Sequence, residues 1–140
     1  MIMKHLLNVV GFLFIACGMV QAQTSPYRVV FDLTSRDSLE QVSVMRWVKE
    51  ITSSNPEAKL EVVMYGKGFE LAMSEKSTVA AAMKEALKNP NVSFSVCEVA
   101  MKNNKVDRSQ LFPGVRTVPD GIYEIISKQR EGWGYIKVMH

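Results

Sequence analysis

One cysteine, Cys97, stands where a strand-like run ends and a helix-like run begins. The run VSFSVC before it is rich in apolar and β-branched residues, and EVAMKNNK after it resembles a short helix. A thiol at the start of a helix lies near the positive end of the helix dipole, which favours the nucleophilic thiolate. Lys102 and Arg108 would add positive potential, whereas Glu98 would oppose it. The alternative is a small inert residue of the core, because cysteine is among the most buried residue types.

A second candidate is the glycine-containing turn YGKG, which follows an earlier strand-like run. In a parallel α/β sheet, ligands bind at the carboxyl ends of the strands, so this turn, residues 34–36, residues 116–121 and Cys97 are expected at one edge. Its backbone N–H groups would be available to an anion. The turn matches neither a P-loop nor a G-x-G-x-x-G motif, and a plain strand-to-helix turn is the alternative. The candidate binding residues are Tyr65, Gly66 and Gly68.

Other chemistries lack the residues they need. Residues 23–140 contain one cysteine and one histidine, which is His140 at the extreme C-terminus. A metal site needs clustered His, Cys and carboxylate ligands, so none is expected. A Cys–His pair or a Ser–His–Asp triad would require the terminal histidine to fold back. The sequence implies no metal and no organic cofactor.

The first 22 residues have the layout of a secretory signal peptide. Lys4 precedes a long apolar run, and the small-residue motif VQA ends at Ala22. We therefore expect cleavage after Ala22 and an exported, periplasmic protein. The apolar run is too short to favour a transmembrane helix, so the mature form is not expected in a membrane. An uncleaved N-terminal anchor, or a lipoprotein linked through Cys17, is the alternative.

The rest of the chain, residues 23–140, is long enough for one domain with its own core. Without Lys4 it carries 16 basic and 14 acidic residues, a net charge of +2. This charge is too small to indicate binding to nucleic acid or to a membrane surface. Removal of the signal also removes Cys17, so the mature chain cannot form an internal disulfide.

Strand-like and helix-like runs alternate along this domain, which predicts parallel β-α-β units in a three-layer α/β sandwich. The strand-like runs are nearly continuous in apolar residues, as expected when helices cover both faces of a sheet. Asp37 or Ser38 is a suitable cap for the first helix. The expected strands are 27–34, 59–66, 92–97 and 133–138, with a short one around 115–118, and the expected helices are 38–53, 78–89, 98–105 and 119–132.

Several of these segments resemble the DsrE/DsrF-like (YchN-like) family. The resemblance is carried by VVFDLTS, LEVVMYGKGFELAM, VSFSVCEVAMKNN and LFPGVRTVPDGIYEIISKQREGWGYIKV, and it is strongest for the exported single-domain members. It implies a flavodoxin-like, mostly parallel sheet and assembly into trimers or hexamers. In the sulfur-relay members a cysteine just after a central strand carries a persulfide, and Cys97 matches that position.

Two functions remain open at this level. In the first, Cys97 takes sulfane sulfur as a persulfide from a donor protein or a small sulfur species and passes it to an acceptor, as a carrier or transferase and not a hydrolase. In the second, the protein is a non-catalytic binding or assembly module with a buried structural thiol. Trp133 and Tyr135 share one face of the last strand, where they would serve as core or subunit contacts or as a ligand-stacking surface. A sheet that ends in such a strand is expected to hide its edge in a homo-oligomer.

Overall fold

The structure is a computed structural model that describes residues 26–139, and the predicted signal peptide lies outside them. Five strands form one sheet in the order β4-β3-β2-β1-β5. Every neighbouring pair is parallel, which confirms the predicted parallel sheet. The strands are β1 (Arg28–Leu33), β2 (Lys59–Met64), β3 (Val92–Cys97), β4 (Arg116–Val118) and β5 (Gly134–Lys137).

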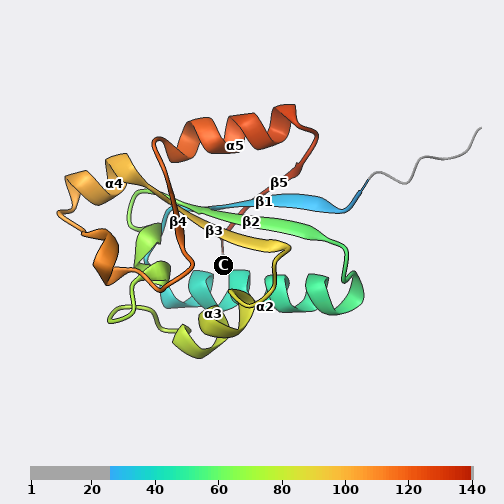
Figure 1. The fold of residues 1–140 in the computed structure, drawn as a ribbon, viewed down its shortest axis with the longest axis horizontal. Coiled ribbons are helices and arrows are strands. Elements are labelled where there is room, and N and C mark those ends of the chain that lie inside the picture. The colour runs from blue at the N-terminus through green and yellow to red at the C-terminus, as the bar shows by residue number, and fades with distance from the viewer. Residues whose placement is uncertain (1–25, 140) are drawn as a thin grey trace, which may run out of the picture.

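The helices complete a three-layer sandwich. Figure 1 shows α2 and α3 together on one face of the sheet and α5 on the other, with α4 beyond the end of β3. Within the described residues no helix is long and apolar enough to cross a membrane. The helices are α2 (Ser38–Ser54), α3 (Ala80–Ala86), α4 (Glu98–Asn103) and α5 (Gly121–Arg130), with 3-10 turns η1 (Gly68–Ala72) and η2 (Arg108–Gln110).

The two faces of the sheet differ in their chemistry. The face under α2 and α3 carries the main apolar core, in which Phe31 stacks on Trp47 with ring centroids 6.1 Å apart. The face under α5 has only a small apolar cluster, made by Val30, Val63 and Ile125. A single helix covers that face, so it leaves room for polar groups near the strand ends.

Three polar side chains are buried on strands next to this small cluster, namely Asp32, Glu61 and Ser95. Ser95 donates a hydrogen bond to Glu61 at 2.6 Å, and Lys128 of α5 lies 3.3 Å from the other carboxylate oxygen. A buried charge is tolerated only with such partners, so Lys128 both neutralises Glu61 and holds α5 on the sheet.

The first helix begins as predicted, because Asp37 caps it by accepting hydrogen bonds from the N–H groups of Leu39 and Glu40. The prediction for α3 was too long at both ends. Thr78, the expected first residue, instead uses its N–H and its hydroxyl to bind the side chain of Gln41 at 3.1 and 2.7 Å. These contacts tie the turn that precedes α3 to α2.

Candidate functional site

A pocket of about 230 Å³ opens at the carboxyl ends of β2 and β3, and Cys97 forms part of its wall. The apolar part of the wall consists of Tyr65, Val99, Ala100 and Ile122. The remaining lining residues are Gly66, Asn103, Asn104 and Asp120. The pocket therefore places one thiol in a largely apolar surrounding that also offers amide groups and one carboxylate.

Cys97 is the free cysteine of the described residues and is only 5% exposed. It is the last residue of β3 and the N-cap of α4, with an extended backbone. Its side chain makes no capping hydrogen bond, so the N–H groups in the first turn of this six-residue helix keep no side-chain partner from the cap. The predicted strand-to-helix junction at Cys97 is thus confirmed.

The charged residues that closely follow Cys97 in the sequence do not line its pocket. Thr117 donates a hydrogen bond to the Glu98 carboxylate at 2.8 Å, and Arg108 donates one to the hydroxyl of Thr117. Neither Lys102 nor Arg108 lines the pocket. Glu98 does not line the pocket either, so none of the three charged groups expected to act on the thiol forms part of the pocket wall.

The structure separates the three candidate binding residues of the glycine-containing turn. Tyr65 and Gly66 line the Cys97 pocket, whereas Gly68 is buried. A β-carbon on Gly68 would stand 2.1 Å from the Leu33 carbonyl oxygen, so glycine is needed there for close backbone packing. The N–H groups of Tyr65, Lys67 and Gly68 already donate to backbone carbonyls, which leaves the turn with the Gly66 N–H at most for an anion.

The start of α5 closes one side of the pocket. Asp120 caps this helix by accepting hydrogen bonds from the N–H groups of Ile122 and Tyr123 at 2.8 and 3.2 Å. A β-carbon on Gly121 would stand 3.1 Å from the Cβ of Cys97 and 3.3 Å from that of Tyr65. A side chain at this position would require Cys97, Tyr65 or α5 to shift by a few tenths of an ångström.

A polar cluster around Asp32 lies on the other side of Tyr65. The buried Asp32 carboxylate accepts hydrogen bonds from Tyr135 at 2.7 Å, from Lys137 at 3.1 Å and from Tyr65 at 3.3 Å. Lys137 also donates to Thr34 at 2.7 Å. The cluster ties edge strand β5 to β1 and to the residue that follows β2.

This arrangement raises the pKa of both tyrosines above the ordinary value of 10.0. The hydrogen bond to Asp32, followed by burial, raises the pKa of Tyr135 to about 12. Burial is the first cause for Tyr65, followed by the charge of Asp32 and the hydrogen bond to it. Both phenols therefore stay protonated at neutral pH and act as donors.

Sequence reasoning missed the Asp32 cluster. The available signals were the carboxylate in the apolar run VVFDL and the alternation of Tyr135 and Lys137 along the last strand. Tyr135 is 42% exposed and donates a hydrogen bond to Asp32. Trp133 precedes β5 and makes a cation–π contact with Lys128, whose Nζ lies 4.9 Å from the centroid of the ring. The two rings thus belong to separate contacts.

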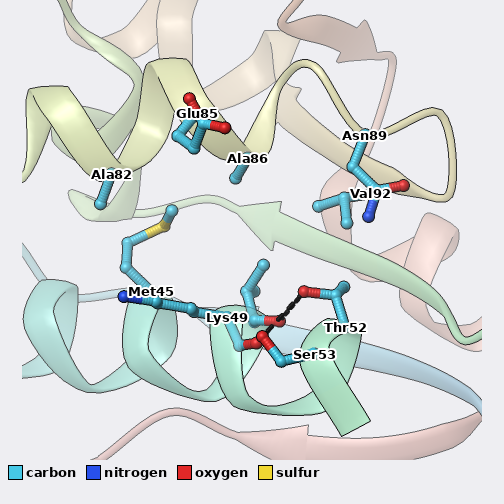
Figure 2. Close-up of a pocket in the computed structure, with 10 residues that line it drawn as sticks. Met45, Lys49, Thr52, Ser53, Ala82, Glu85, Ala86, Asn89 and Val92 are labelled. Atoms are coloured by element: carbon cyan, nitrogen blue, oxygen red, sulfur yellow. Dashed lines mark hydrogen bonds between the residues drawn. The ribbon is translucent and has the colours of Figure 1, made fainter. Parts of the chain in front are cut away.

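A groove of about 400 Å³, larger than the Cys97 pocket, lies between α2 and α3 on the face of the sheet that these helices cover. Figure 2 shows Met45 and Val92 among its lining residues, with Lys49 and Glu85 on different helices. The hydroxyl of Thr52 is already bonded to the Val48 carbonyl at 2.8 Å. Because its lining contains neither cysteine nor histidine, this groove is a poorer candidate for chemistry than the Cys97 pocket.

Within residues 26–139, no group of three or more His, Cys, Asp or Glu side chains could hold a metal ion. Fold and site together define an α/β protein with a cysteine pocket at the carboxyl edge of a parallel sheet. The chain belongs to the DsrE/DsrF-like family, whose model matches residues 28–138, and this family is associated with sulfur relay.

Solved structures of similar fold include proteins from an archaeon and a bacterium. A protein of unknown function from Methanobacterium thermoautotrophicum is 27% identical, with a TM-score of 0.74 over 79% of this chain and 98% of that one. A conserved protein of unknown function from Bacteroides thetaiotaomicron is 14% identical, with a TM-score of 0.64 over 86% of this chain and 100% of that one. The second likeness concerns the fold alone. No curated protein matches the chain.

Proposed function

We propose that this protein carries sulfane sulfur as a persulfide on Cys97. The observation that supports this most is that Cys97 is placed in the wall of a pocket at the ligand-binding edge of the sheet. Membership of a family associated with sulfur relay supports the same conclusion.

The loading step is a sulfur exchange. The Cys97 thiolate attacks the outer sulfur of a hydropersulfide R–S–SH, a new S–S bond forms, and the donor's S–S bond breaks. The electron pair leaves with R–S⁻, which then takes up a proton. In the unloading step an acceptor thiolate attacks the outer sulfur and Cys97 leaves as thiolate. No outside oxidant or reductant is needed, because each step exchanges one S–S bond for another.

The pocket suits this chemistry in two respects. Its apolar side chains can contact polarisable sulfur, and the first turn of α4, which follows the thiol directly, has no side-chain cap on its N–H groups. Two N–H groups of α5 donate to Oδ1 of Asp120, which fixes this carboxylate as the cap of that helix.

Mass spectrometry of the native protein tests the proposal directly. After exposure to a polysulfide we expect a gain of one sulfur atom on Cys97, which a reducing thiol removes. The variants Cys97→Ser and Cys97→Ala should show no such gain while keeping the same circular dichroism spectrum. If native Cys97 gains no sulfur and reacts with a small thiol reagent only after unfolding, the carrier function is wrong.

The second candidate is a binding or assembly module whose thiol is structural. The low exposure of Cys97, 5%, favours it. The two candidates differ in the native reactivity of Cys97, which the same experiment measures.

We further propose that the protein is exported and acts as a homo-oligomer. The signal-peptide pattern of residues 1–22 supports export, and mass determination of protein from its native host should give a chain that starts at Gln23. The exposed apolar side chains of edge strand β5, Tyr135 and Ile136, support an assembly that covers this edge.

A further inference from the structure

Tyr65 lies between the Cys97 thiol and the Asp32 carboxylate, which do not contact each other. It follows β2, whose neighbours in the sheet are β3, which ends in Cys97, and β1, which carries Asp32. Its β-carbon lies on the Cys97 side, since Cys97 and Tyr65 both closely approach the position above Gly121. Its hydroxyl donates to Asp32, so the ring is directed toward β1 and away from the thiol.

Asp32 is held in place by partners other than Tyr65. The same carboxylate oxygen accepts the shorter hydrogen bond from Tyr135, and the other oxygen accepts one from Lys137. The Lys137 ammonium also lies 5.8 Å from the centroid of the Tyr65 ring, in a cation–π arrangement. Asp32 therefore offers a fixed acceptor that selects one direction for the Tyr65 ring.

The space beside Tyr65 is the Cys97 pocket itself. The side chain forms part of the pocket wall, and a β-carbon on Gly121 would stand 3.3 Å from the β-carbon of Tyr65. Tyrosine has three staggered positions about its first side-chain torsion. A ring that left Asp32 would have this pocket open to it, since the side chain already forms part of the pocket wall.

We propose that Asp32 is a positioning residue that keeps the Tyr65 ring out of the Cys97 pocket and thereby keeps the thiol accessible. The proposed sulfur carriage needs this access, but the positioning role concerns only entry to the pocket. The positioning role rests on the proposed function only in that both require Cys97 to be reached through this pocket. Asp32 and Cys97 do not touch, and the effect passes through the tyrosine ring.

The test is the rate at which native Cys97 reacts with methyl methanethiosulfonate, a small neutral reagent. In Tyr65→Phe the ring remains but its anchor to Asp32 is lost, so labelling should slow by about threefold to tenfold, as one hydrogen bond biases the ring. In Tyr65→Ala no ring is left to enter the pocket, so labelling should be at least as fast as in the wild type. The opposite behaviour of the two variants is the signature of positioning.

Further variants separate this role from general damage to the fold. Tyr123→Phe removes an exposed phenol that does not contact Asp32 and should stay within about twofold of the wild-type rate. Asp32→Asn should slow labelling, and Asp32→Asn combined with Tyr65→Ala should return to the rate of Tyr65→Ala. Thermal unfolding measured alongside shows whether each variant is folded during labelling.

The outcomes are distinct. If Tyr65→Phe labels at the wild-type rate, or if both Tyr65 variants slow together, the positioning role is wrong while sulfur carriage can still stand. If wild-type Cys97 is loaded with sulfur and Tyr65→Phe is slow where Tyr65→Ala is not, both proposals hold. If wild-type Cys97 resists the reagent in the folded protein, both are overturned.

Discussion

Gly121 packs directly against Cys97, and a β-carbon added to Gly121 would stand 3.1 Å from the β-carbon of Cys97. Nine in ten real β-carbon contacts are wider than this, so the start of α5 and the end of β3 are closely packed. The close approach of α5 to Cys97 therefore depends on glycine at position 121.

Gly121→Ala is expected to slow the native labelling and the sulfur loading of Cys97. The added methyl group must displace Cys97, Tyr65 or the first turn of α5, and such overpacking costs roughly 1–3 kcal/mol of stability. Labelling kinetics and urea unfolding measure the two effects. Gly134→Ala is the matched control, because its new β-carbon would meet its nearest neighbour at an ordinary 3.5 Å. Equal labelling rates for both variants would contradict the prediction.

Loss of Lys128 is expected to destabilise the fold strongly. Lys128→Met would leave the Glu61 carboxylate buried without a counter-charge, which costs about 3–5 kcal/mol in comparable buried pairs. Adding Glu61→Gln should recover most of this loss, since a neutral amide needs no counter-charge and still accepts the hydrogen bond from Ser95. Urea unfolding of the single and double variants measures the difference.

The surface pair of Lys88 and Glu85 provides the control for that experiment. Both side chains are more than two-thirds exposed, so Lys88→Met should change stability by no more than about 1 kcal/mol. A Lys128 variant as mild as the Lys88 variant would show that Glu61 does not need its partner.

The contribution of Tyr135 to stability should depend on pH. Its pKa is raised to about 12 in the folded protein, so the protonated phenol stabilises the fold fully below the ordinary pKa of 10.0. This stabilisation is lost as the pH rises from 10 toward 12. The difference in free energy of unfolding between wild type and Tyr135→Phe should thus be largest near neutral pH and shrink at about pH 11. Tyr123→Phe is the control, because Tyr123 is 61% exposed and does not contact Asp32.

Light scattering tests the proposed assembly. The mature chain, residues 23–140, should have the mass of a trimer or a hexamer at micromolar concentration. A charged residue in place of Ile136, which is 38% exposed on edge strand β5, should reduce that mass if this edge is part of the contact. A monomer mass for the wild type across this range would overturn the assembly.

Local features of the chain were predictable because neighbouring residues alone decide them. The alternation of apolar runs with helical patterns predicted the parallel sheet and the helices on both of its faces. Asp37, one of the two candidate caps, lies directly before the first residue of α2. The junction at Cys97 was visible for the same reason, since an apolar, β-branched run ends at that residue and a helix-like run begins after it. The helix predicted over 78–89 was too long at both ends, and the contact of Thr78 with Gln41, 37 positions earlier, was not visible in the local pattern.

The candidate site as a whole was decided only by the tertiary structure. Asp32 meets Tyr135 across 103 positions of sequence, and Tyr65 meets Asp32 across 33. Such contacts depend on which strands become neighbours, and the return of β5 to the side of β1 is not encoded in any local pattern. The sequence by itself determined that a thiol would stand at the carboxyl edge of a parallel sheet. Only the packing of α5 and β5 decided what surrounds that thiol, because side chains distant in sequence compete for the same space.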